Sequence, residues 1–288
     1  MKKLIKAFIC ACVLAGLLAA GGSACAEAGS GELSVHVFSF GKADSYLFMT
    51  GESAVLIDCG ESENGKEIVQ YLKEKGFSEL DCLILTHFDK DHVGGAAKVL
   101  KSIQVQRVLQ SNSPKDSKQM EKYLKALDGT GVEAETVSEE LTFTLGDAKF
   151  TVYPPQRENY EKDPSNNSSL VTSVRLGENS FLFTGDAESA RLAEIVSLEL
   201  GTFDVLQIPH HGEWDMLLVN LLRMTDPSYA LITSSEEEPE DMRTMQLLQQ
   251  ESVEALLARE GEVDIVSDGR TVAVSRAGDK GKSLAPAA

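Results

Sequence analysis

The sequence predicts an α/β fold, a four-layer αβ/βα sandwich built from two similar halves. Short strand-like segments separated by turn residues begin at residue 33, and apolar runs then alternate with amphipathic helical segments. The same order, strands and then alternation, returns from residue 133. No shift in composition divides the two stretches, so we expect residues 33–276 to form one domain after a polar linker at 27–32.

The first half begins as a meander of short strands, with turns at Gly41-Lys42 and around Gly51. A helix over 64–75 follows, with its apolar residues on one face and Gly76 as its stop. An uninterrupted apolar run over 80–86 is typical of a strand buried on both faces. The elements expected here are strands at 34–40, 45–49 and 54–58, a helix at 64–75, a strand at 80–86, a helix at 93–101, a strand at 105–110 and a helix at 115–127.

The second half repeats this order around a polar, proline-bearing loop at 154–168. Apolar residues at helical spacing predict a helix over 188–200, and the apolar run at 203–209 predicts another buried strand. Residues 277–288 are small and charged and are expected to be a disordered tail. The other elements are expected as strands at 133–137, 141–145 and 149–153, a hairpin over 169–186, a helix near 216–223, a strand at 229–233, a long helix over 240–259 and a hairpin over 263–274.

The first 26 residues resemble a secretory signal peptide. Three lysines precede an apolar stretch of 14 residues, and Ala24-Cys25-Ala26 supplies a small-residue cleavage site. We therefore expect an exported, extracytoplasmic protein with no membrane span after cleavage. Two alternatives stay open. An uncleaved span would need roughly 20 apolar residues, and lipoprotein attachment at Cys25 lacks the leucine expected three residues before the cysteine.

Cysteine count and charge limit the classes of function. After cleavage only Cys59 and Cys82 remain, both in apolar strand-like runs, so buried thiols are favoured over a disulfide. Removal of the leader lysines takes the formal charge from −18 to −21. Such an acidic chain repels long nucleic acids but attracts a divalent cation, and a small phosphoester substrate remains compatible with it.

Two histidines and two aspartates lie close together in the segment LTHFDKDHVGG, residues 85–95. His87, Asp89, Asp91 and His92 follow a buried strand directly, and ligand residues in open α/β sheets gather outside the carboxyl ends of strands. The two glycines that follow allow close approach of the backbone. This composition favours a metal site over a charged, solvated turn.

Further potential ligands end three other apolar strands: Asp58, Asp186 and the pair His210 and His211. Four of the five histidines in the chain therefore lie at strand ends. Because such ends meet at one edge of a sheet, we expect these side chains to converge on one site.

This set of motifs resembles the metallo-β-lactamase superfamily, whose αβ/βα sandwich holds one or two divalent metals through an HxHxDH loop. Within it, the likeness is to the hydrolase domain of the competence protein ComEC and its stand-alone secreted relatives. It covers nearly all of residues 33–276. The segments that carry it are VHVFSFGKADSYLF with Asp44, LIDCG with Asp58, THFDKDHVGG, SNNSSLV, FLFTGDAE, IPHHG and PSYALIT.

The resemblance implies roles for the residues at the strand ends. Asp58 would support the metal loop by hydrogen bonds, as an outer partner of the ligands. His211 is the less favoured of the histidine pair as a ligand. The implied ligands are His87 and Asp89 for one metal, Asp91 and His92 for a second, Asp186 between the two, and His210 as a further ligand or a phosphate-side contact.

The sequence departs from the superfamily pattern at three places. Asp89 stands where lactamase- and glyoxalase-type hydrolases have the middle histidine, although ComEC-like members share that change. Asn166 or Asn167 occupies the stretch where another histidine is expected, and Glu238 replaces a late histidine before Pro239. The first metal site is therefore depleted, and the number of ions, one or two, stays open.

The activity implied is that of a secreted metal-dependent hydrolase in which a metal-bound hydroxide attacks a phosphodiester or related ester. Asp91 or Asp89, where not a ligand, would orient the water as a general base. The imidazoles favour zinc, whereas the carboxylates make manganese an alternative. Two other functions remain open: a degenerate, non-catalytic binding protein, and a lactone, lactam or thioester hydrolase. The sequence leaves the oligomeric state open.

Overall fold

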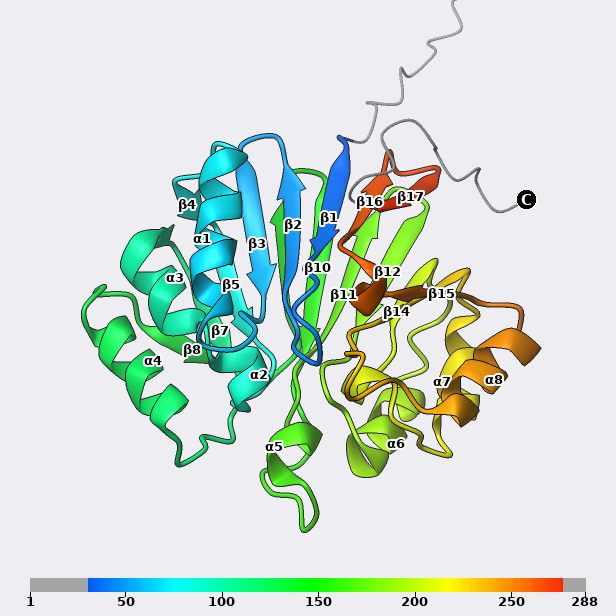
Figure 1. The fold of residues 1–288 in the computed structure, drawn as a ribbon. Helices are drawn as coiled ribbons and strands as arrows, with labels where there is room; N and C mark the ends of the chain where they lie inside the picture. The colour runs from blue at the N-terminus through cyan, green and yellow to red at the C-terminus, as the bar shows by residue number, and fades with distance from the viewer. Residues whose placement is uncertain (1–30, 277–288) are drawn as a thin grey trace, which may run out of the picture.

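Two large β-sheets pack face to face in the computed structural model, which describes residues 31–276 (Figure 1). Helices cover the outer face of each sheet, so the layers run helix, sheet, sheet, helix. The predicted four-layer α/β sandwich is confirmed. The leader expected at 1–26 and the tail expected at 277–288 lie outside the described residues.

The first sheet is antiparallel at one end and parallel at the other. Its strands are β1 (Leu33–Val37), β2 (Tyr46–Thr50), β3 (Ser53–Ile57), β5 (Cys82–Leu85), β7 (Val108–Gln110), β8 (Ala134–Thr136), β16 (Val263–Ser267) and β17 (Val272–Arg276). They lie in the order β17-β16-β1-β2-β3-β5-β7-β8, and the pairs from β3 to β8 are parallel. A parallel strand is covered on both faces, which is why β5 is uninterruptedly apolar.

The second sheet has the same mixed character. Its strands are β9 (Leu141–Leu145), β10 (Ala148–Tyr153), β11 (Val171–Leu176), β12 (Asn179–Phe183), β13 (Val205–Gln207), β14 (Tyr229–Ile232) and β15 (Glu254–Leu257). They lie in the order β15-β14-β13-β12-β11-β10-β9, and the pairs from β12 to β15 are parallel. A small two-stranded sheet joins β4 (Glu79–Leu80) to β6 (Gln104–Val105).

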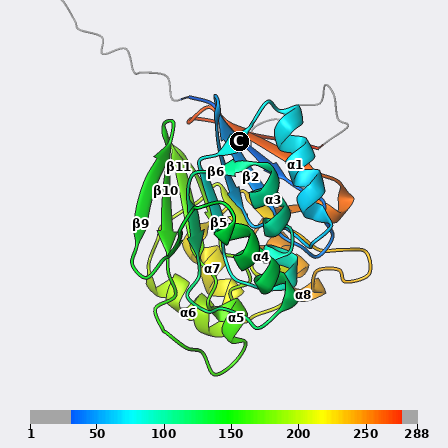
Figure 2. The same ribbon diagram turned by 90° about the vertical axis from the view of Figure 1, so that its left-hand side faces the viewer.

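Three helices cover each sheet. The first sheet carries α1 (Asn64–Glu74), α3 (Ala96–Ser102) and α4 (Lys118–Asp128), and the second carries α6 (Ser189–Ser197), α7 (Leu218–Thr225) and α8 (Met242–Gln250). Figure 2 shows α1, α3 and α4 on the side of the molecule opposite to β9 and β10. Two short helices, α2 (Lys90–Val93) and α5 (Pro164–Asn167), lie at the lower end of the view in Figure 1.

Aromatic side chains fill the space between the two sheets. Phe48 on β2 lies with its ring centroid 5.2 Å from that of Phe150 on β10 and 5.1 Å from that of Phe183 on β12. All three side chains are almost fully buried. Edge-to-face packing of this kind fixes the sheets against each other, and so fixes the distance between their carboxyl ends.

The prediction of a long helix over 240–259 is wrong. α8 ends at Gln250, and Ser252 has a φ of 60°, which turns the chain out of the helix. Residues 254–257 then pair with β14 as the edge strand β15. The apolar residues up to Leu248 lie on the helix, as their spacing predicted. Leu256 and Leu257 are buried by the pairing of β15 with β14 and not by a continued helix.

Smaller differences concern the first half. The helix predicted over 93–101 is α3, which begins at Ala96, and the short helix α2 precedes it. The strand predicted over 105–110 is divided into β6 and β7. The loop predicted at 154–168 contains the short helix α5. The division between α2 and α3 falls at Gly94 and Gly95, where the backbone packs too closely on a neighbouring loop for a side chain.

Cys59 and Cys82 are buried free thiols, which confirms their prediction as small apolar core residues. None of the helices within residues 31–276 has both the length and the apolarity that crossing a bilayer requires.

Candidate metal centre

Loops at the carboxyl ends of the parallel strands supply the site. Asp58 follows β3, and the loop that carries His87 to His92 follows β5. Asp186 follows β12, and His211 follows β13. The two sheets face each other, so these four loops meet at one edge of the sandwich (Figure 1).

Close backbone packing holds the histidine loop in place. A Cβ atom built on Gly95 would lie 2.3 Å from the carbonyl oxygen of Cys59, and one on Gly94 would lie 2.6 Å from the backbone nitrogen of Ser62. Only glycine permits such an approach. The backbone nitrogen of Cys59 also donates to the carbonyl of His92 at 2.7 Å, which fixes this histidine against the end of β3.

Four side chains converge on one point. The ligand atoms of Asp91, His92, Asp186 and His211 all lie within 4.8 Å of one another. The Nε2 atoms of His92 and His211 each lie 3.2 Å from Oδ2 of Asp186, and Nε2 of His211 lies 3.4 Å from Oδ2 of Asp91. Asp91 is half-buried and the other three are buried.

The buried polar atoms of this cluster test whether a cation fits. Nε2 of His87, His92 and His211 and Oδ1 of Asp186 have no hydrogen-bond partner among the described residues. Buried polar atoms are seldom left in this state without a ligand, ion or water to satisfy them. Two imidazoles and two carboxylates are a donor set suited to zinc or a harder divalent ion, so the residues present fit a metal.

A fully buried carboxylate supports His92. Asp58 Oδ2 lies 2.8 Å from His92 Nδ1, and the same carboxylate accepts from the backbone nitrogen of Thr86 at 2.8 Å and from its hydroxyl at 2.6 Å. A carboxylate only accepts here, so Nδ1 of His92 carries a proton and Nε2 is the atom left to bind a metal. This is the geometry of the supporting role implied for Asp58.

His211 has a comparable support that sequence reasoning missed. Its Nδ1 lies 3.1 Å from the hydroxyl of Thr233, which donates to Asp44, and 3.5 Å from Asp44 itself. Asp44 and Thr233 are both fully buried. Asp44 stands two residues before the start of the strand β2, and Thr233 directly follows β14. Both lie in segments that carry the family resemblance, VHVFSFGKADSYLF and PSYALIT, but neither was assigned a role at the site.

The remaining members of the histidine loop lie to one side. Nε2 of His87 is 3.9 Å from Oδ2 of Asp186, and its Nδ1 lies 3.1 Å from the Thr86 hydroxyl. Asp89 is not one of the four converging side chains, and its Oδ1 accepts from Lys115 Nζ at 2.7 Å and from the Ser165 hydroxyl. The loop therefore delivers Asp91 and His92 to the cluster, with His87 at its border.

The structure places His211, rather than His210, in the cluster. Nδ1 of His210 lies 3.4 Å from Glu188 and 3.6 Å from Glu213, outside the four converging side chains. Both histidines have positive φ, 50° and 54°, so consecutive side chains leave this tight turn in different directions. The sequence analysis favoured His210 because the segment IPHHG does not predict the positive φ angles of this turn.

Of the two asparagines in the stretch where a histidine was expected, Asn166 lies at the cleft and Asn167 supports a loop. The side-chain amide of Asn167 donates to Lys162 O at 3.0 Å and its Oδ1 accepts from Arg191 N at 2.9 Å, so Asn167 holds the loop before α6. Asn166 lines the cleft instead and donates to Glu188 at 2.8 Å. Glu238, at the position of the absent late histidine, also lines the cleft, with its carboxylate 3.3 Å from Lys42 Nζ.

Attraction between the carboxylates and the imidazoles shifts the pKa values of the cluster. Burial disfavours the charged form of His92 and His211, but Asp186 outweighs it and holds the pKa of both well above the usual histidine value. Burial alone would raise the pKa of Asp186, but His211 and His92 hold it well below the usual value. Burial and the neighbouring His92 lower the pKa of His87.

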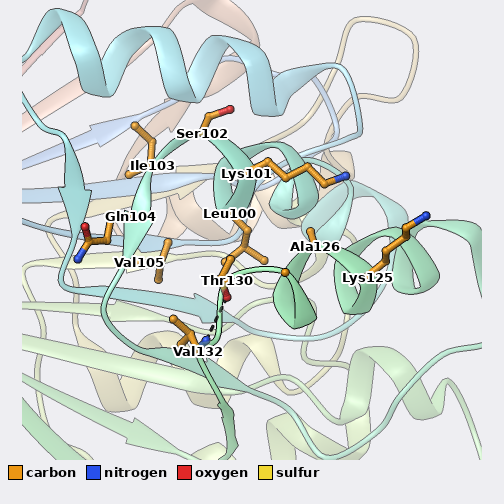
Figure 3. Close-up of a pocket in the computed structure, with 11 residues that line it drawn as sticks. Leu100, Lys101, Ser102, Ile103, Gln104, Val105, Lys125, Ala126, Thr130 and Val132 are labelled. Carbon is orange, nitrogen blue, oxygen red and sulfur yellow. Dashed lines mark hydrogen bonds between the residues drawn. The ribbon is translucent and has the colours of Figure 1, made fainter.

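A cleft of about 780 Å³ opens onto the cluster. Asp91, Asp186 and His211 lie at its floor, and Lys42, Lys90 and Lys115 also line it. A separate pocket lies between α3, β6 and α4 (Figure 3). None of the eleven residues that line that pocket is acidic or a histidine, so it offers no comparable ligand set.

Comparisons with known proteins agree with this geometry. A family model described as the metallo-beta-lactamase superfamily matches residues 39–234. The chain is 32% identical over 201 residues to ComE operon protein 3 of Bacillus subtilis, across 66% of this chain and 25% of that protein. It is 29% identical over 213 residues to Recombination protein 2 of Haemophilus influenzae, across 71% of this chain and 24% of that protein. The chain thus spans about a quarter of the length of these relatives.

Solved structures show the same fold at low identity. The metallo-beta-lactamase fold protein YhfI from Bacillus subtilis matches with a TM-score of 0.54 and 16% identity, over 79% of this chain and 96% of that chain. CmlA, a diiron beta-hydroxylase from Streptomyces venezuelae, matches with a TM-score of 0.51 and 16% identity, over 86% of this chain and 54% of that one. At such identities the likeness concerns the fold alone.

Proposed function

The chain belongs to the metallo-beta-lactamase superfamily, and from that premise we propose that it is a metal-dependent hydrolase acting on a phosphodiester or a related ester. The observation that carries the proposal is the convergence of Asp91, His92, Asp186 and His211. Nε2 of His92, Nε2 of His211 and Oδ1 of Asp186 are buried and have no hydrogen-bond partner among the described residues. Zinc is the favoured ion because of the two imidazoles, and manganese is the alternative because of the two carboxylates.

The chemistry divides between the ion and the chain. A divalent ion at this site supplies a Lewis acid that makes water acidic enough to lose a proton near neutral pH. His92 and His211 present their Nε2 atoms to it, and Asp58 and Thr233 fix the orientation of the two rings.

Asp91 has a second role in this proposal. It is the most exposed member of the cluster and lines the cleft, so its free carboxylate oxygen can accept a hydrogen bond from water and orient it towards a substrate. Burial opposes the charged form, but His211 and His92 hold the pKa of Asp91 well below its usual value, so it stays ionised at neutral pH. Asp89, also considered as a base, is engaged by Lys115 and Ser165 and is the weaker candidate.

An ester with anionic oxygens suits this cleft. Three lysines line it alongside six acidic residues, and each lysine is paired with a carboxylate that an anionic substrate could replace. The carboxylate-rich ligand set favours a hard ion, which binds substrates through oxygen. The size of the cleft, about 780 Å³, suits a small molecule. Long nucleic acids remain disfavoured by the overall charge.

One alternative function has an observation in its favour. Glu238 replaces the late histidine and is paired with Lys42, which is compatible with a member that keeps the fold and a bound metal as a non-catalytic binding protein. The two proposals differ in turnover. A panel of phosphodiester, thioester, lactone and lactam substrates also separates the preferred reaction from acyl or lactam hydrolysis.

The test combines metal content with activity. Protein purified without added metal is expected to contain a divalent ion and to hydrolyse bis(p-nitrophenyl) phosphate. His92→Ala and Asp186→Asn are expected to lose both properties, whereas Asp128→Asn, an exposed change at the end of α4, keeps both. Metal in the wild type without turnover on any substrate of the panel would favour the binding protein, and wild-type protein that binds no divalent ion would refute the hydrolase.

We also propose that the protein acts outside the cytoplasm, on the strength of the leader-like residues 1–26. Intact-mass measurement of protein recovered from a bacterial envelope or medium tests this. A mature chain that begins at Glu27 supports cleavage by signal peptidase, and a lipid-modified Cys25 supports the lipoprotein alternative. A chain that keeps residues 1–26 contradicts both.

A further inference from the structure

Lys115 occupies the side of the site where the superfamily pattern leads one to expect a metal ligand. Its Nζ lies 2.7 Å from Oδ1 of Asp89, and the hydroxyl of Ser165 donates to the same oxygen. The three residues come from three different segments, the loop after β5, the loop after β7 and the short helix α5. Asp89 is therefore held between two donors.

This arrangement disfavours a cation next to Asp89. An ammonium group at ion-pair distance neutralises the carboxylate and repels a divalent ion. A hydrogen-bonded hydroxyl occupies a further acceptor position on the same oxygen. Both donors contact Oδ1, so a metal could use that oxygen only after displacing them, and at Oδ2 it would still lie close to the ammonium group.

Around Asp89, the further potential ligands of a second ion are His87 and a shared Asp186, because both asparagines are engaged elsewhere. Asn167 is committed to backbone groups of Lys162 and Arg191, and Asn166 donates to Glu188. Nε2 of His87 lies 3.9 Å from Oδ2 of Asp186, and Nε2 of His210 lies 3.4 Å from the amide nitrogen of Asn166. A protein zinc site has three or four protein ligands, and the cluster of Asp91, His92, Asp186 and His211 already supplies four.

We infer that this centre binds one divalent ion, at Asp91, His92, Asp186 and His211, and that the Lys115 ammonium group, held by Asp89, takes the place of a second ion. The inference rests on the proposed metal chemistry, but it concerns the number of ions rather than the reaction. It assigns Lys115 a role as the fixed positive charge beside the metal. It also assigns Asp89 to positioning that charge rather than to ligation.

Metal stoichiometry tests the inference without any activity measurement. The metal-free full chain is titrated with Co²⁺, with the visible absorption of the bound ion as the readout, and elemental analysis after gel filtration counts the ions retained. The wild type is expected to bind one ion per chain. Lys115→Met frees Asp89 and is expected to raise the number towards two, an increase of about twofold.

Three control variants separate charge from structure. Lys115→Arg keeps the positive charge and is expected to stay at one ion. Lys122→Met, the same change at an exposed position on α4, is also expected to stay at one. Asp89→Asn removes the ion pair from its other side and is expected to retain one ion, because Asp89 is not a ligand.

Each other outcome overturns the inference. Two ions in the wild type would show that Lys115 does not exclude the second, and one ion in Lys115→Met would show that the lysine is not the cause. Loss of the ion in Asp89→Asn would make Asp89 a ligand. A wild type that binds no ion would refute the proposed function as well, which distinguishes the two failures.

Discussion

Asp58 accepts a hydrogen bond from His92, with 2.8 Å between Oδ2 of the aspartate and Nδ1 of the histidine. Nε2 on the other side of the ring lies 3.2 Å from Oδ2 of Asp186. The carboxylate selects the tautomer that leaves Nε2 free and fixes the plane of the ring. Asp58 itself has a φ of 57°, a conformation uncommon outside glycine, so the end of β3 is shaped to present this side chain.

Replacement of Asp58 by Asn is therefore expected to weaken metal binding without removing a ligand. The amide can still contact Thr86 but no longer stabilises the proton on Nδ1, and losses of about 10- to 100-fold in metal affinity are typical of such outer partners. Competition with a chromophoric chelator measures the affinity. Asp128→Asn serves as the matched control, and an unchanged affinity in Asp58→Asn would contradict the supporting role.

The two neighbouring histidines are expected to behave differently. His211→Ala removes a member of the cluster and should abolish stoichiometric metal binding, whereas His210→Ala, whose ring pairs with Glu188 and Glu213, should retain the ion. Elemental analysis of both variants checks this. The reverse result would restore the preference for His210 suggested by the sequence.

This pair also marks the boundary of what the sequence could predict. Apolar strands followed by ligand-type residues predicted the four-layer fold and the convergence of the strand-end loops, because parallel strands end at a common edge. The direction of each side chain depends on backbone angles in a tight turn, and the αL conformations at His210 and His211 leave no trace in residue type. Asp44 was overlooked as a partner because its contact, Thr233, lies 189 residues away along the chain.

Tertiary contacts also explain why the long helix predicted over 240–259 is wrong. Residues 240–259 contain apolar side chains at a spacing that fits a helix. The local sequence pattern cannot indicate that the edge of β14 is available for pairing with residues 254–257. Pairing with that edge satisfies backbone groups and buries Leu256 and Leu257, which overrides the helical preference of the segment.

Thr233 and Asp44 give a second test of ring positioning. Thr233→Val keeps the shape of the side chain but removes the hydroxyl that links His211 to Asp44. We expect metal affinity to fall by about 10-fold or more, with the one-ion limit of the titration unchanged. Thr244→Val provides a control, since Thr244 is equally buried but lies on α8. Equal affinity losses in both variants would indicate a general packing effect instead.

The charges of the metal-free cluster predict that metal binding releases protons. Burial disfavours the cationic form of both rings, but Asp186 holds the pKa of His92 and of His211 well above the usual histidine value. Before a metal binds, both rings are therefore protonated on both nitrogens at pH 7. A metal can use Nε2 only when that proton has left. His87, whose pKa is lowered by burial and by His92, is already neutral and contributes no proton.

The sign follows directly. Each proton released makes the apparent metal affinity rise with pH, by about tenfold per unit for each proton, until the pH passes the raised pKa values of the two rings. Calorimetric titrations at pH 7 in buffers of different ionisation enthalpy should report the release of about two protons per ion from the wild type. A His87→Gln variant should release the same number, because that ring starts neutral. An affinity that stays constant between pH 6 and pH 8 would show that Asp186 does not hold protons on the two imidazoles in the metal-free protein.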